Sequence, residues 1–118
     1  MLNAHSIADT ITVPAPSGGA TSGVPFILGT LLAIPVTDAA EGEPVAVQIE
    51  RAFILPKLST AVIAAGAKVI WDVSAGQVIV ASATAGDLNN FGVAIAAAGN
   101  GTTTCVVKLT PGAGSLAT

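Results

Sequence analysis

Residues 45–55, "VAVQIERAFIL", carry the clearest strand pattern in this chain. Apolar residues alternate with others that include Gln48 and Glu50, so an extended segment would have one hydrophobic and one polar face. Arg51 interrupts the hydrophobic face. The pattern predicts a half-buried β-strand whose inward side chains are Val45, Val47, Ile49, Phe53 and Leu55.

Similar short segments lie on both sides of this stretch. They are rich in β-branched residues and are separated by glycine-containing turns. Short strands with frequent turns indicate an all-β fold, which we expect to be a small single-domain β-barrel or sandwich. The further predicted strands are 9–14, 26–28, 31–34, 68–73, 77–81, 91–97 and 104–109, with a hairpin turn at "VSAGQ" (73–77).

Three segments depart from the strand pattern. Residues 59–66, "STAVIAAG", are predicted to form at most one short helix, closed by the final glycine. Residues 1–8 precede any strand pattern and are predicted to be an extended N-terminal arm, ordered only against another surface. The β domain is expected to span residues 9–110, and the small, uncharged residues 111–118 to form a flexible C-terminal tail.

The composition predicts a partner surface. Hydrophobic residues make up 52% of the 118, and only 9% are charged, against about 25% in ordinary soluble domains. A domain of this size hides only about two thirds of its unfolded surface, so it cannot internalise all of its apolar area. We therefore expect part of the exterior to be covered by another protein.

The glycine-rich stretch before residue 24 has the spacing of a phosphate-binding loop at Gly18 and Gly23. The next residues are Val24 and Pro25, where that loop needs Lys and a hydroxyl side chain, so nucleotide binding is not expected. The apolar run over residues 24–36 is too short and too interrupted to cross a membrane. The stretch is therefore interpreted as a turn followed by core strands, with no membrane partner.

The charge distribution and the N-terminal sequence argue against nucleic-acid binding and against secretion by a signal peptide. The four basic residues are scattered and the net charge is −3, so nucleic acid is not an expected partner. The start, "MLNAHSIADT", lacks the pattern of a secretory signal. Cys105 is the only cysteine, which excludes an intramolecular disulfide and suits a reducing interior; we expect it to be a buried small hydrophobe.

No catalytic or metal-binding constellation is predicted. His5, Ser6 and Asp9 resemble a nucleophile with its base, but they fall in or beside the predicted arm, which cannot hold them in place. Three nearby carboxylates lack the spacing of a calcium loop and are interpreted as solvated turn charge. We therefore expect no catalytic residue, no metal and no cofactor; the three carboxylates are Asp38, Glu41 and Glu43.

The features, taken in order, resemble those of the small phage capsid cement proteins, also called head decoration or capsid fibre proteins. The resemblance rests on "DTITVPAPSGGATSG", "LGTLLAIPVTDAAEGEPVAV", "AFILPK", "AAGAKVIWDVSAGQV", "FGVAIAAAGNG" and "TTTCVVKL", which together span residues 9–109. It implies a structural virion protein, not an enzyme, that binds the outside of an assembled head and stabilises the shell. It also implies the major capsid protein and further copies of this chain as partners, as a homotrimer or a dimer, and synthesis in the cytoplasm of the bacterial host.

Four residues are candidate partner contacts under this resemblance. Leu2 and Ile7 of the arm would contact the shell, and Phe26 or Trp71 the neighbouring subunit. A lone tryptophan is more typical of a core or an oligomer contact than of a sugar-binding platform, which usually has several aromatic rings. Two alternatives remain open: a virion-displayed or cell-surface binding module, such as an adhesin or glycan-binding domain, and a small enzyme.

Overall fold

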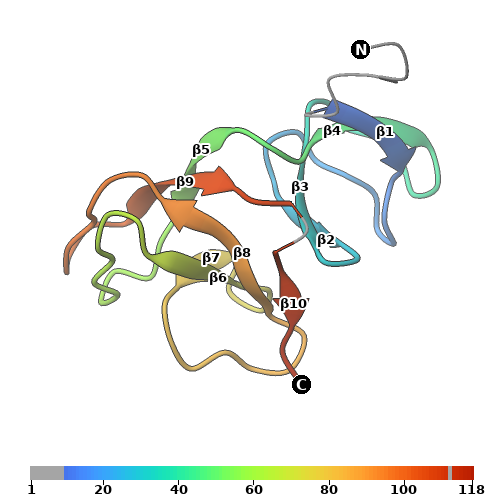
Figure 1. Ribbon diagram of the computed structural model, residues 1–118. Coiled ribbons are helices and arrows are strands. Elements are labelled where there is room, and N and C mark those ends of the chain that lie inside the picture. The colour runs from blue at the N-terminus through green and yellow to red at the C-terminus, as the bar shows by residue number, and fades with distance from the viewer. Residues whose placement is uncertain (1–9, 112) are drawn as a thin grey trace, which may run out of the picture.

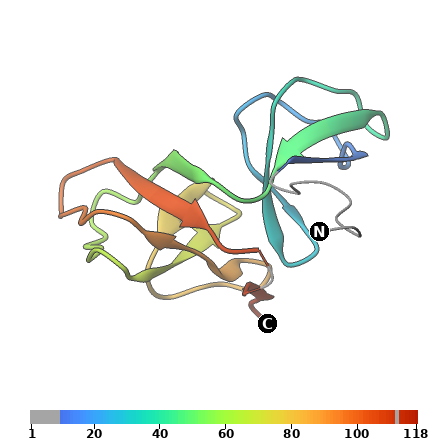
Figure 2. The same ribbon diagram turned by 45° about the horizontal axis from the view of Figure 1, so that its top comes forward.

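Two antiparallel sheets divide the chain into two lobes in the computed structural model, which describes residues 10–111 and 113–118 (Figures 1 and 2). The N-terminal lobe, residues 10–49, has the strand order β1-β4-β3-β2. The C-terminal lobe, residues 50–118, has the order β5-β9-β8-β6-β7, with β10 paired to β8. The prediction of an all-β fold is confirmed; the two open sheets suit a sandwich-like arrangement and form no closed barrel.

The strands are short, as the sequence predicted. Those of the N-terminal lobe are β1 (Thr10–Pro14), β2 (Phe26–Leu28), β3 (Leu31–Pro35) and β4 (Pro44–Gln48). Those of the C-terminal lobe are β5 (Ala52–Pro56), β6 (Lys68–Asp72), β7 (Gln77–Ile79), β8 (Leu88–Ala94), β9 (Thr104–Leu109) and β10 (Ser115–Leu116).

The stretch 45–55 forms two strands instead of the single one predicted. β4 pairs with β1 and β3, and β5 pairs with β9 in the other sheet. The chain bends at Glu50 and Arg51, which are both exposed. The alternation continues through the bend because each half buries the same set of alternate positions, so the pattern alone did not reveal the break.

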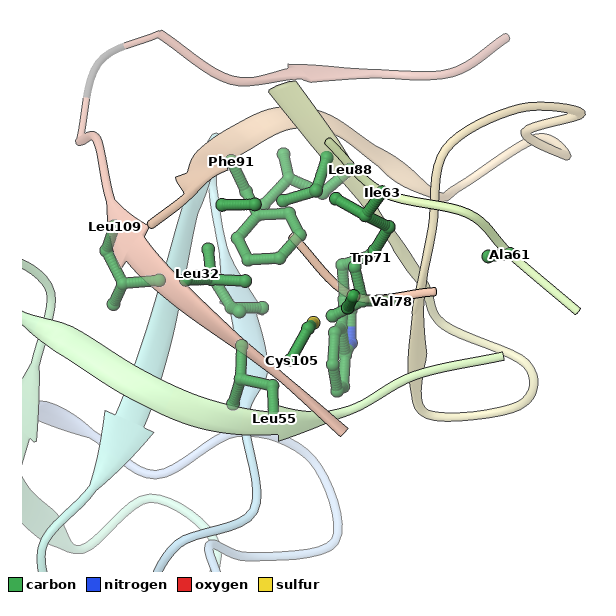
Figure 3. Packing of buried hydrophobic residues seen from close by; sticks show 14 of the residues in the cluster. Leu32, Leu55, Ala61, Ile63, Trp71, Val78, Leu88, Phe91, Cys105 and Leu109 are labelled. Carbon is green, nitrogen blue, oxygen red and sulfur yellow. The ribbon is translucent and has the colours of Figure 1, made fainter. Parts of the chain in front are cut away.

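β3 supplies both hydrophobic cores, which explains why its sequence is apolar without alternation. Leu32 and Ile34 belong to the core of the C-terminal lobe, whereas Ala33 belongs to the smaller core of the N-terminal lobe. Figure 3 shows Leu32 reaching from β3 among Leu55, Phe91 and Leu109. The described residues therefore form two cores, and β3 couples them.

The predicted hairpin between β6 and β7 is confirmed. Gly76 has a φ of +66°, a conformation that favours glycine, and its N–H donates to the carbonyl of Asp72 at 2.8 Å. The Asp72 carboxylate accepts hydrogen bonds from the Ser74 backbone N–H and hydroxyl. Gly76 and Asp72 thus close the turn.

The helix predicted over residues 59–66 is absent. Ala61 and Ile63 are buried while Val62 between them is 66% exposed, which is the period of an extended chain. The Ile63 N–H donates to the Ala98 carbonyl, and the reverse hydrogen bond is also made, both at 2.8 Å. Tertiary pairing therefore overrides the local preference.

Part of the segment 111–118, which was expected to be a loose tail, pairs with the sheet. Ser115 and Leu116 lie opposite Asn89 and Leu88 of β8. The Ala117 N–H donates to the Asp87 carbonyl at 2.8 Å.

No helix in the described ranges is long and apolar enough to cross a membrane.

Candidate docking surfaces

A row of aliphatic side chains crosses the outer face of the C-terminal sheet. Ile54 of β5 lies opposite Val106 of β9, and the N–H of Ile95, just after β8, donates to the Val106 carbonyl at 3.0 Å. Ile54 is 72% exposed and Ile95 52%. Facing residues of adjacent strands share one face of a sheet, so the three form one apolar strip, named the outer row below.

Two lysines lie beside the outer row on the same face. Lys68 of β6 is opposite Val93 of β8, and Val93 is opposite Lys108 of β9. Lys108 forms an ion pair of 3.7 Å with Glu50, in which both side chains are about half exposed. The outer row and these two lysines combine an apolar surface with positive charge.

A groove of about 670 Å³ separates the two lobes. Its walls are mostly apolar; residues 23–27 form one wall, and residues of the β6–β7 hairpin and β10 contribute to the other. Its exposed rim includes Val24, Val73 and Leu116. The groove and the outer row share no residue, so the described chain presents two separate apolar surfaces.

Asp87 fixes the groove wall on the C-terminal side. It is 2% exposed, and its carboxylate accepts the N–H of Val73 at 3.1 Å and the N–H and hydroxyl of Thr84 at 2.9 and 3.2 Å. Burial raises the pKa of this carboxyl, but the hydrogen bonds from Thr84 and Val73 together outweigh burial and leave the pKa below its ordinary value. An ionised Asp87 thus joins the β6–β7 hairpin to the loop before β8.

Lys57 is a second buried charge of the C-terminal lobe, and it also fixes a loop. It is 3% exposed, and its ammonium donates to the backbone carbonyls of Leu58, Ser59 and Ala61 at 2.7, 3.4 and 2.5 Å. These bonds satisfy a buried charge and fix the loop that the sequence predicted as a helix. Neither buried charge was predicted from the sequence, because a single Lys or Asp in a strand or turn is usually solvated.

Cys105 is buried, as predicted. Burial raises the pKa of its thiol, and the nearby Lys57 charge lowers it by less, so the net shift is upward. The thiol is therefore protonated at neutral pH and a poor nucleophile.

The structure brings the two predicted aromatic contacts to the same groove. Phe26 lines it and is half-buried, and Trp71 lines it while being only 4% exposed. Trp71 packs edge-to-face on Phe91, with ring centroids 6.1 Å apart, so it belongs first to the core. Leu2, Ile7 and the His5, Ser6 and Asp9 group lie outside the described residues.

Two of the three carboxylates of the N-terminal lobe hold its loops together. Glu41 accepts the N–H of Gly18 at 2.9 Å, and Asp38 accepts the N–H of Ser22 at 2.7 Å. Glu43 is exposed on the same loop. Among the described residues, no group of three His, Cys, Asp or Glu side chains is arranged to hold a metal ion.

The outer row was not singled out from the sequence, although a signal was present. Ile54 falls on the side of the 45–55 pattern that carries Gln48 and Glu50, so an isoleucine there is an apolar residue at a solvent-facing position. Such a residue in a sheet suggests a covered face.

One of the comparisons with known proteins finds a match. A family model described as "Phage cement protein" matches residues 5–109, which includes every strand from β1 to β9. No curated protein and no solved structure matches the chain. Because the family model covers most of the sequence, the family is established, and with it a capsid-associated structural role: the chain belongs to the phage cement protein family.

Proposed function

We propose that this protein binds the outer surface of an assembled phage head and stabilises the shell. The observation that carries the proposal is the pair of separate apolar surfaces, the groove and the outer row, on a chain that belongs to a capsid cement family. A subunit that bridges its neighbours needs more than one contact surface. The major capsid protein and further copies of this chain, as a homotrimer or a dimer, are the proposed partners.

The proposed mechanism is mechanical and needs no chemistry. Each copy would bury about 1,000–2,000 Å² against its neighbours, the range of specific protein interfaces. A protein that binds only the mature, expanded shell stabilises that state by mass action, by about 2.7 kcal/mol per site at 100 times its Kd. Leu2 and Ile7 remain the predicted shell contacts, and Phe26 a predicted contact at the groove.

The proposal is tested with undecorated heads. Purified protein is mixed with expanded heads and, as a control, with unexpanded precursor heads, and bound protein is measured by co-sedimentation. We expect saturable binding to expanded heads, weaker binding to precursors, and greater resistance of decorated heads to heat and osmotic shock. Absence of binding at micromolar protein would overturn the proposal.

Glycan binding, the alternative from the sequence, gains no support from the site. A stacking platform must offer an exposed ring face, and Trp71 is 4% exposed and packed on Phe91. A glycan array with the Trp71→Ala variant as control would still detect such binding.

A further inference from the structure

We propose that copies of this chain associate head to tail, with the outer row of one copy receiving the acidic loop of the next. The acidic loop is defined as residues 36–43. The inference rests on the proposed self-association and names the two surfaces that would carry it. Charge, exposure and loop structure each support this pairing.

The outer row exposes large apolar side chains that would be more stable covered by another protein surface. Ile54 is the most exposed of the large hydrophobic side chains that the structure describes, and it lies within a strand where it cannot turn away. Val106 of β9 and Ile95, just after β8, extend the same strip across the sheet. A contiguous apolar strip on a sheet face, with lysines at its side, has the form of a protein interface with a polar rim.

The two lobes differ in charge. The N-terminal lobe carries only acidic residues, Asp38, Glu41 and Glu43, and no Lys or Arg. All four basic residues of the chain belong to the C-terminal lobe, which also carries three acidic ones. Lys68 and Lys108 lie on the face of the outer row, where Lys108 is paired with Glu50 and Lys68 supplies the positive charge. The acidic loop also presents Val36, which is 48% exposed. It therefore offers an apolar side chain with negative charge to a surface that is apolar with positive charge.

The acidic loop is held in place before any contact forms. The hydrogen bonds from Gly18 to Glu41 and from Ser22 to Asp38 fix it against the preceding turn. A loop that is already ordered loses less conformational entropy on binding.

These charges favour a head-to-tail contact over a symmetric one. Two outer faces brought together would bring Lys68 of one copy near Lys68 of the other, and two acidic loops would repel each other. A contact between different surfaces is heterologous, and its repetition closes into a ring when the rotation allows. A three-membered ring of this kind would be the homotrimer.

The test is a charge-exchange experiment on the purified full chain. Association is measured by sedimentation equilibrium and light scattering over a range of protein and salt concentrations. We expect the natural chain to associate, and Lys68→Glu and Glu43→Lys each to weaken association about tenfold or more. The double variant Lys68→Glu/Glu43→Lys should restore it, and a mixture of the two single variants should associate better than either alone.

The apolar part of the contact has a matched control within the same lobe. Ile54→Asp is expected to abolish association, while Val62→Asp, at a side chain of similar exposure outside the outer row, leaves it unchanged. Thermal unfolding of both variants shows that each is folded.

The outcomes separate this inference from the proposed function. A natural chain that stays monomeric yet binds heads would overturn the head-to-tail contact and leave the function standing. If the natural chain is monomeric and Lys68→Glu loses head binding, the outer row contacts the capsid protein, and the head-to-tail contact is refuted as well. Association with charge rescue but no head binding would uphold the contact and refute the function.

Discussion

The two lobes bury very different cores. The N-terminal core consists of six buried residues, three of them alanines, together with half-buried side chains around them. The C-terminal core gathers fifteen buried residues around the Trp71 and Phe91 rings, and two of those residues come from β3 of the other lobe. The C-terminal lobe also contains both buried charges, Lys57 and Asp87. The N-terminal sheet is therefore stabilised in large part by the side chains that β3 buries in the C-terminal core.

This difference has a physical consequence for a docking protein. A sheet with few buried residues loses less packing free energy when its conformation changes. The larger C-terminal lobe can then serve as the rigid part of the molecule. Matched substitutions in the two lobes test this comparison, beginning with the largest expected effect.

Removal of an aromatic ring should cost far more in the C-terminal lobe. Trp71→Ala is expected to lower the free energy of unfolding by about 3–5 kcal/mol, because it leaves a cavity in the main core. Phe26→Ala should cost about 1–2 kcal/mol, because the ring is half-buried at the groove. Urea denaturation measures both; equal losses would contradict a difference in packing between the lobes.

Removal of a carboxylate charge should also lower the free energy of unfolding more in the C-terminal lobe than in the N-terminal lobe. Asp87→Asn should cost about 1–3 kcal/mol, because an amide cannot accept all the hydrogen bonds from Val73 and Thr84. Asp38→Asn, at an exposed carboxylate, should cost about 0.5 kcal/mol or less.

The Asp87 effect has a defined pH dependence. Because its pKa is lowered in the folded state, its stabilisation is complete above the ordinary carboxyl pKa of about 4 and is lost as pH falls through the lowered value. The difference in stability between the natural chain and Asp87→Asn should therefore be constant near neutral pH and shrink in acid. A difference that grows in acid would refute the assignment.

The last comparison concerns two fully buried valines, one in each lobe. Val107→Ala and Val47→Ala each remove about 1.6 kcal/mol of transfer free energy at 0.8 kcal/mol per group. We expect Val107→Ala to speed amide hydrogen exchange throughout the C-terminal sheet. Val47→Ala should speed exchange about tenfold in β1 and β4 and leave β8 and β9 within about twofold. Equal acceleration everywhere after Val47→Ala would show that the lobes open as one unit.

Strand positions were accessible from the sequence wherever local chemistry fixes them. β9 and the β6–β7 hairpin were predicted from alternation and from a glycine turn, and β2 and β3 from apolar runs bounded by turn residues. The helix expected at residues 59–66 failed because Ile63 pairs with Ala98, some 35 positions further along the chain. The C-terminal residues joined the sheet through a partner strand that local composition does not indicate.

The candidate surfaces were only partly predictable. The sequence indicated Phe26 and Trp71 as contacts, and the fold places both at one groove, with Trp71 mainly in the core. Ile54, Val106 and Ile95 come from three separate segments of the chain, so the outer row does not exist until the sheet is assembled.

The sequence by itself determined the all-β class, most strand positions and the burial of Cys105, because strand alternation and turn chemistry act between residues close together in the chain. Only the tertiary structure decided that β4 and β5 enter different sheets, that β3 serves two cores, and that Lys57 and Asp87 are buried. Those outcomes depend on contacts between residues far apart in the chain, whose free energies no local pattern contains.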